Sequence, residues 1–188
     1  MEVFEKLLDP ELYAYFKNAT FYENPVFHTA HKMVDFYIEF ENVIPLEIYE
    51  QIITKLQLSL HAHVKLHMHT KNCVIEMDEL DRYVNYFVEK YSDVKDFRFL
   101  HPYLENDTIC FSTRDESRLA ALNLALPSLM EKLEDVGITQ EIVCKKVEDD
   151  IEIETAKVQV SAPVVKQEPV KKQYSSSNSY KKESATTY

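Results

Sequence analysis

The first 75 residues carry two kinds of hydrophobic pattern. Residues 33–40 (MVDFYIEF) alternate between apolar and polar side chains, which predicts a strand with one buried face. The apolar face carries Phe36, Ile38 and Phe40. Residues 45–60 place apolar side chains three or four positions apart, as in a helix with one apolar side that begins at Pro45. Residues 61–70 (HAHVKLHMHT) alternate again and predict a second strand.

The N-terminal residues predict helix followed by an irregular extended segment. Residues 3–17 fit two short helical pieces that are separated at Asp9 and Pro10. Asp9 can cap the second piece and Pro10 can occupy its first position. Residues 19–27 are expected to be extended and irregular, because Pro25 interrupts them.

A second set of elements is predicted from Met77 onward. A helical stripe covers residues 77–91, a loop region follows, and a short strand is expected at 109–113. Asp115 is placed to cap a long leucine-rich helix, in which Pro127 predicts a kink or a break. The apolar stripe of this helix is Leu119, Leu122, Leu126, Leu129 and Leu133. Gly137, the only glycine of the chain, predicts the helix end, and residues 140–147 predict a last strand.

These elements predict an α+β protein with two small units and a tail. Residues 1–75 form the first α+β unit and residues 76–150 the second, without a sequence repeat that would indicate a duplication. After residue 150 the chain has fewer aromatic residues and more Lys, Ser, Pro and Gln. Residues 151–188 are therefore expected to be a disordered linker.

The charge balance argues against nucleic-acid binding by the first 150 residues. The chain has a net charge of −11, and its last 38 residues contain six lysines and four glutamates, which leaves −13 on residues 1–150. Binding to a phosphate backbone draws most of its free energy from Lys and Arg. We therefore expect no direct nucleic-acid binding by this region.

The cysteines and the apolar segments predict a cytoplasmic protein. Cys73, Cys110 and Cys144 are widely spaced and odd in number, so they indicate neither a disulfide framework nor a zinc knuckle, and we interpret them as packing residues. The acidic N-terminus does not resemble a signal peptide, and no apolar run approaches the length of a membrane span.

The strand at 61–70 contains four of the seven histidines, and these residues raise the question of a metal site. Its odd positions place the histidines and Lys65 on one face, opposite an apolar face. The histidines are His61, His63, His67 and His69. Two His-x-His pairs could each contribute to a zinc site, but each would need further ligands, and His28 and His31 are the candidates. The alternatives are a solvated strand face and a pH-dependent contact with a partner. We predict no metal site.

Other catalytic patterns are absent from the sequence. A chain with one glycine cannot form a Gly-rich phosphate loop, and no G-x-S-x-G motif occurs. We interpret the carboxylates Asp78, Glu79 and Asp81 as a helix N-terminus. The carboxylates Glu148, Asp149 and Asp150 are interpreted as a solvated acidic run. Exposed members of the set Tyr13, Tyr15 and Tyr22 could anchor a protein partner. We predict no catalytic residue, no cofactor and no small-molecule substrate.

Two runs of the sequence resemble a known family. The first is FYIEFENVIPLEIYEQIITKLQLSLHAHVKL, and the second is NDTICFSTRDESRLAALNLALPSLMEKLEDVGI. In order and spacing they resemble the N-terminal region of the PolC-type alpha subunit of bacterial DNA polymerase III, over roughly residues 1–150. The resemblance implies two small α+β units, the first KH-like. Nucleic-acid-binding KH domains use a GXXG loop, which this sequence lacks.

The resemblance also implies a role in DNA replication. The family's full-length parent is a DNA-directed DNA polymerase, a nucleotidyltransferase with a 3′–5′ exonuclease that uses divalent metal ions. None of its catalytic carboxylates can be placed in this chain. We therefore predict a non-catalytic region that tethers the polymerase within the replisome, with the clamp-loader tau subunit as the expected partner. The alternatives are a free-standing acidic adaptor domain, a KH-type nucleic-acid-binding module and a small metalloprotein.

Overall fold

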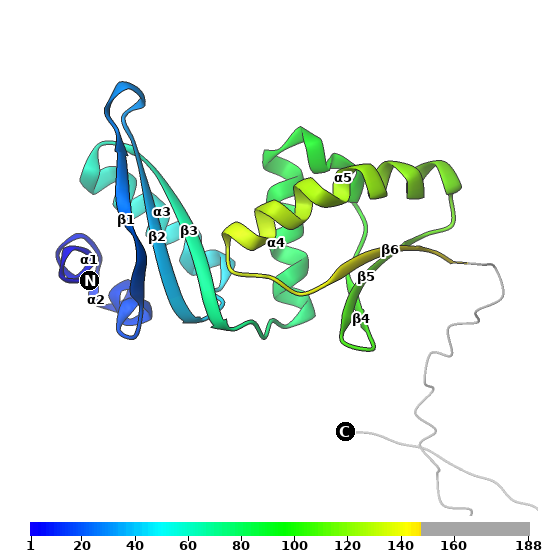
Figure 1. Cartoon of the computed structure of the whole chain (residues 1–188), viewed down its shortest axis with the longest axis horizontal. Coiled ribbons are helices and arrows are strands. Elements are labelled where there is room, and N and C mark those ends of the chain that lie inside the picture. The colour runs from blue at the N-terminus through cyan, green and yellow to red at the C-terminus, as the bar shows by residue number, and fades with distance from the viewer. Residues whose placement is uncertain (148–188) are drawn as a thin grey trace, which may run out of the picture. The chain divides into compact units, whose positions relative to one another are not determined.

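The computed structural model describes residues 1–147, and the linker expected at residues 151–188 lies outside this range. The described chain contains helices and two separate three-stranded sheets (Figure 1). This confirms the predicted α+β class. The KH-like arrangement of the first unit stays a prediction.

The first sheet has the strand order β1-β2-β3. Its strands are β1 (Thr20–His28), β2 (Met33–Asn42) and β3 (His63–Asn72). β1 pairs with β2 in antiparallel orientation and β2 pairs with β3 in parallel. The segment expected to be irregular is a strand, and its register with β2 shifts between Phe21 and Glu23 and again between Glu23 and Val26. Pro25 lies inside the second shift, where the missing N–H breaks the ladder.

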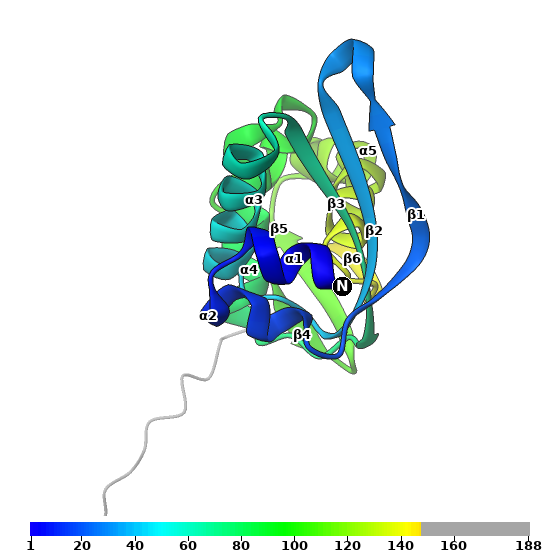
Figure 2. The ribbon, with the colours of Figure 1, turned by 90° about the vertical axis from the view of Figure 1, so that its left-hand side faces the viewer.

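Helices cover one face of this sheet. They are α1 (Glu2–Leu7), α2 (Pro10–Tyr13), the 3-10 turn η1 (Ala14–Phe16) and α3 (Leu46–Leu60). All of these helices lie on the same side of the sheet (Figure 2). The ring of Phe4 packs on Phe36 and the ring of Phe16 on Phe40, each pair with centroids 5.1 Å apart. The helical break predicted at Asp9 and Pro10 is confirmed, although the Asp9 side chain does not cap α2.

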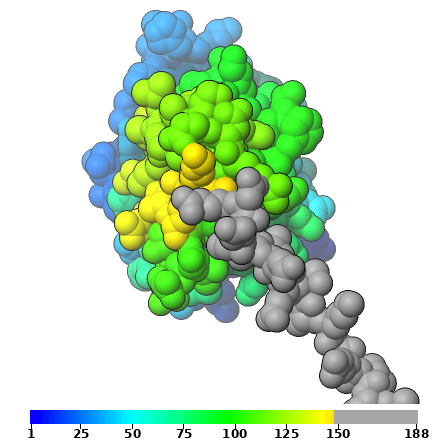
Figure 3. Space-filling model, turned by 90° about the vertical axis from the view of Figure 1, so that its right-hand side faces the viewer, coloured from blue at the N-terminus to red at the C-terminus, as the bar shows by residue number. Residues whose placement is uncertain are grey.

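The second half begins with α4 (Met77–Lys90) and the 3-10 helix η3 (Ser92–Phe97). Its sheet has the order β4-β5-β6, with β4 (Tyr103–Glu105), β5 (Thr108–Thr113) and β6 (Ile142–Lys146). Asn106 and Asp107 both have positive φ in the two-residue turn between β4 and β5, a conformation that Asn and Asp tolerate. Figure 3 views the molecule from the side of this second half. The tip of the β1–β2 hairpin (blue) projects beyond the second half in this view.

Both halves have the same connection of elements. In each half an antiparallel hairpin is followed by a helix and then by a strand that pairs in parallel with the second strand of the hairpin. The connecting helix is α3 in the first half and α5 (Glu116–Asp135) in the second. A shared topology therefore exists where the sequence alone shows no repeat.

Helix α5 begins and ends as predicted. The Asp115 carboxylate accepts hydrogen bonds from the backbone N–H groups of Ser117 and Arg118. At the other end Gly137 has φ +82°, its N–H donates to the Glu134 carbonyl, and the Ile138 N–H donates to the Leu133 carbonyl. This pair of bonds is a Schellman motif.

Pro127 lies inside α5 without dividing it, so of the predicted kink or break the break is wrong and the kink stays a prediction. A proline inside a helix removes one backbone hydrogen bond. The buried positions Leu122, Ala125, Leu129 and Leu133 lie on both sides of Pro127, and their packing holds the two parts of α5 in one helix.

The two halves are in direct contact, and residues 1–147 lie within one compact unit. Tyr83 of α4 is fully buried, and its hydroxyl donates to the Ile44 carbonyl at 2.6 Å. The Leu46 N–H at the start of α3 donates to the Glu79 carboxylate of α4 at 2.5 Å. A side chain of the second half thus caps a helix of the first half. The boundary between residues 75 and 76 stays a prediction.

A second set of contacts joins β3 to the segment after α5. Met68 forms an isolated parallel bridge with Val136, and the Thr70 hydroxyl donates to the Gly137 carbonyl at 2.6 Å. The Thr139 N–H donates to Cys73 Sγ at 3.3 Å. We call the contacts of residues 68–73 with residues 136–139 the β3 junction. It covers part of the outer edge of β3, which would otherwise expose unpaired backbone groups.

We predict that Gly137→Ala destabilises the chain by more than about 1 kcal/mol, since an L-residue at this φ is strained. A Cβ at this position would also lie 2.5 Å from Thr70 Cγ2. Thr70→Ser removes that methyl group and keeps the hydroxyl, so Gly137→Ala should cost less in the Thr70→Ser background. Urea unfolding of the four proteins gives both values. Equal costs in the two backgrounds would contradict the close approach.

Candidate functional site

The histidine-rich segment forms a strand with the two faces that its alternation predicts. Val64, Leu66 and Met68 are buried, and the opposite face carries Lys65 and three of the histidines. These histidines are His63, His67 and His69. The position predicted for His61 is wrong. It is the C-cap of α3 with φ +50°, so it lies before the strand and does not share its polar face.

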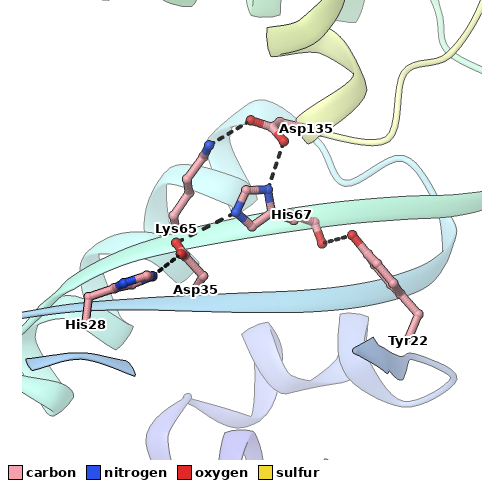
Figure 4. A network of polar contacts seen from close by, with 6 residues as sticks. All are labelled: Tyr22, His28, Asp35, Lys65, His67 and Asp135. Carbon is pink, nitrogen blue, oxygen red and sulfur yellow. Dashed lines mark hydrogen bonds and ion pairs between the residues drawn. The ribbon is translucent and has the colours of Figure 1, made fainter. Parts of the chain in front are cut away.

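A buried carboxylate is the centre of the polar contacts on this face. Asp35 of β2 is only 7% exposed, although it lies on the polar side of the strand. Its Oδ2 is 2.8 Å from His28 Nε2, and its Oδ1 is 3.7 Å from His67 Nε2 (Figure 4). The second distance is too long for a hydrogen bond, so the His67 ring faces Asp35 without bonding to it.

A second carboxylate approaches His67 from the end of α5. His67 Nδ1 is 2.9 Å from Asp135 Oδ1, and Lys65 Nζ is 3.1 Å from Asp135 Oδ2 (Figure 4). Asp135 is the last residue of α5, where the helix dipole disfavours a negative charge. Lys65 and His67 of β3 supply the compensating groups. We call Asp35, His28, His67, Lys65 and Asp135 the Asp–His network.

Tyrosine rings cover the two histidines next to this network. The Tyr37 ring stacks on His67 with centroids 4.6 Å apart, and the Tyr22 ring stacks on His69 at 4.0 Å. The Tyr22 hydroxyl also donates to the His67 carbonyl at 3.4 Å. Burial, followed by the negative charge of Glu23, raises the pKa of Tyr22. The face is exposed at His63, Lys65 and His69, as expected for a solvated strand face, whereas His67 is only 20% exposed.

The geometry of His67 does not suit it for acid–base catalysis. A general base needs one ring nitrogen that can reach a substrate proton. Here Nδ1 is 2.9 Å from Asp135 Oδ1, within hydrogen-bond distance, and Nε2 faces Asp35 Oδ1 at 3.7 Å. Within residues 1–147, no group of three or more His, Cys, Asp or Glu side chains is arranged to hold a metal ion. The network is suited to fixing the shape of this face.

The roles of Asp35 and Asp135 could not be read from the sequence pattern. Asp35 occupies a polar position in the alternation of residues 33–40, and nothing in its neighbours marks it as buried. Asp135 carried a usable signal, since an acidic residue two positions before a helix-ending glycine opposes the helix dipole. Such a residue is expected to have a cationic or histidine partner elsewhere in the fold.

The carboxylates that the sequence offered as candidate catalytic groups do not form a common site. Asp78 and Glu79 lie in the first turn of α4, as predicted, and Glu79 also caps α3. Asp81 Oδ2 is 3.1 Å from His101 Nδ1 on the surface. The acidic run Glu148, Asp149 and Asp150 lies outside the described residues.

The predicted tyrosine anchors and the cysteines lie apart from one another. Tyr15 is exposed, Tyr13 packs partly against the core, and Tyr22 belongs to the face of the first sheet. Burial raises the pKa of Cys110 and raises that of Cys144 to about 11, which disfavours the reactive thiolate at both positions. Cys73 accepts a hydrogen bond in the β3 junction.

A comparison with protein families decides the relationship of the first half. Residues 2–69 match the family DNA polymerase III polC-type N-terminus I. This confirms the resemblance to the N-terminal region of PolC-type DNA polymerase III and connects the chain to DNA replication. The PolC-type match runs from α1 into β3, so it contains every residue of the Asp–His network except Asp135. Resemblance of the second half stays a prediction.

No curated protein matches the chain. Within residues 1–147, none of the helices combines the length and the apolar character that crossing a bilayer requires.

We predict that His67→Ala lowers the free energy of unfolding by about 1–3 kcal/mol, because it leaves the buried Asp35 and the helix-terminal Asp135 without their shared neighbour. The control is His63→Ala on the same strand face, where the side chain is exposed, and its effect should stay within about 0.5 kcal/mol. Thermal and urea unfolding measure both. Equal losses would show that the Asp–His network contributes nothing specific.

Proposed function

We propose that this chain is a non-catalytic protein-interaction region at the front of a PolC-type replicative DNA polymerase III. The match of residues 2–69 to the PolC-type N-terminal family is the observation that carries the proposal. The geometry of His67 supports it, because both ring nitrogens face carboxylates. The parent polymerase would add deoxynucleotides to DNA and proofread them with divalent metal ions, in domains outside this chain.

The proposed role is to tether the polymerase in the replisome of the bacterial cytoplasm. The clamp-loader tau subunit is the first partner to test, and other replisome proteins follow. The charge of −13 on residues 1–150 favours a protein partner over nucleic acid, since a phosphate backbone would be repelled. Contacts between the two halves, such as the buried Tyr83–Ile44 hydrogen bond, hold the region in one shape for recognition.

The test uses the purified 188-residue chain. We expect it to bind a replisome protein such as the tau subunit in a calorimetric titration, and to show no nucleotide incorporation and no exonuclease activity with magnesium. Single-stranded DNA and RNA should not shift the chain in a gel at low salt. Incorporation of nucleotides, or tight binding to single-stranded nucleic acid without any protein partner, would overturn the proposal.

A further inference from the structure

Two hollows in the surface adjoin at Tyr91, the residue that follows α4. The first, of about 160 Å³, lies among residues of α3, β3, α4 and α5. The second, of about 610 Å³, follows the end of α4 and η3. Lys90 and Tyr91 line both hollows, so we treat them as one feature, the Tyr91 groove. The cations that line it are Lys65, Lys90, Lys95, Arg98 and Lys132.

The charge of the Tyr91 groove is opposite to that of the surrounding protein. Residues 1–150 contain 15 Lys and Arg and 28 Asp and Glu, since six lysines and four glutamates of the chain lie beyond them. One third of those cations line the groove, whereas only three of the carboxylates do. These carboxylates are Glu89, Asp96 and Asp135. An even distribution would place about twice as many acidic as basic side chains there, so the groove is a local basic site.

Three of the five cations have no anionic partner among residues 1–147. The Lys90 ammonium contacts only the Tyr86 hydroxyl and ring, and neither Lys95 nor Arg98 forms an ion pair with a described carboxylate. Lys90 lies in the last turn of α4, where the helix dipole stabilises a cation. That effect does not extend to Arg98, which lies beyond η3. Unpaired cations on one surface repel each other and attract carboxylates from a partner.

Aromatic rings hold part of the groove in a defined position. Lys132 Nζ lies 4.7 Å from the centroid of Tyr91 and 2.8 Å from Asp93 Oδ2, and its side chain is only 16% exposed. Lys90 Nζ lies 4.5 Å from the centroid of Tyr86. Ordering these side chains before binding reduces the entropy that a partner must offset.

An exposed aromatic residue follows the groove directly. Phe99 is 84% exposed and has φ +64°, a strained conformation for a bulky residue. The backbone before it is fixed, because Arg118 Nη2 donates to the carbonyl of Arg98 at 2.7 Å. Strained residues persist where the surrounding structure holds them, and they are common at binding sites. Phe99 thus offers an apolar contact beside the basic groove.

We propose that the Tyr91 groove, extended by Phe99, binds an acidic segment of a partner protein that carries an apolar residue among its carboxylates. Lys90, Lys95 and Arg98 receive the carboxylates, and Phe99 packs on the apolar residue. The inference rests on the proposed interaction role and names the surface that performs it. A nucleic acid is the less suitable occupant, because its phosphates would continue from the groove across a surface that is acidic overall.

The test is an NMR titration of the isotope-labelled 188-residue chain with a short glutamate-rich peptide that contains one phenylalanine. We expect shifts of the backbone amides at residues 90–99, weakening as salt is added. A matched peptide with glutamine in place of glutamate should bind about tenfold more weakly. Oligo-dT serves as the phosphate-backbone probe and should cause no shifts at these residues.

A pair of charge-matched variants separates the groove from the overall charge. The groove variant is Lys90→Glu with Lys95→Glu and Arg98→Glu. The control is Lys6→Glu with Lys17→Glu and Lys32→Glu, three exposed lysines outside the groove. Both change the net charge equally. The groove variant should bind the acidic peptide about tenfold more weakly, and the control within about twofold of the unmodified chain. Thermal unfolding confirms that both variants are folded.

Three results would overturn the groove proposal. They are equal losses in the two variants, equal binding of the glutamine peptide, and oligo-dT shifts at residues 90–99. The proposed function fails separately, if the chain binds no replisome protein at all. If a replisome protein binds the groove variant as tightly as the unmodified chain, the interaction role stands and the groove proposal fails.

Discussion

The close contact between Gly137 and Thr70 is the constraint on which the arrangement of residues 1–147 depends. A glycine with positive φ ends α5, and its missing side chain lets the chain lie against β3. The same turn brings Asp135 to Lys65 and His67, and Val136 to Met68. A Cβ at position 137 would lie 2.5 Å from Thr70 Cγ2, so this glycine allows both the end of α5 and its close approach to β3.

This docking has a functional consequence, because the Tyr91 groove is built from both halves. Lys65 comes from β3 of the first half, whereas Lys90 and Lys132 come from helices of the second half. Asp135 connects the groove to the Asp–His network through Lys65 and His67. The smaller hollow exists only while the halves are docked, whereas residues 88–98, which line the larger hollow, all lie in the second half.

Hydrophobic periodicity was sufficient to predict most of the elements. The alternation around Phe36 and Leu66 marks buried strand faces, and Asp115 and Gly137 mark the limits of α5. These signals are local, so a single sequence contains them. Pro127 does not break α5, because packing on both sides of it outweighs one missing hydrogen bond.

The contacts of the candidate site are long-range and could not be predicted in the same way. Asp35 and His67 are on neighbouring strands, and Asp135 reaches His67 from 68 positions away. His61 was misplaced because the alternation of histidines continues without interruption through the helix end, where the backbone turns into a left-handed conformation. The basic groove could not be predicted from the net negative charge of the sequence, because net charge does not show where cations gather on the surface.

We infer that the β3 junction makes the two halves one cooperative body. Native-state hydrogen exchange tests it most directly by measuring the free energy of opening at the amides of β3, β5 and the end of α5. We predict that these amides exchange through one common opening with a shared free energy. Exchange of the first sheet through a separate, lower-energy opening, while β5 and α5 stay protected, would contradict it.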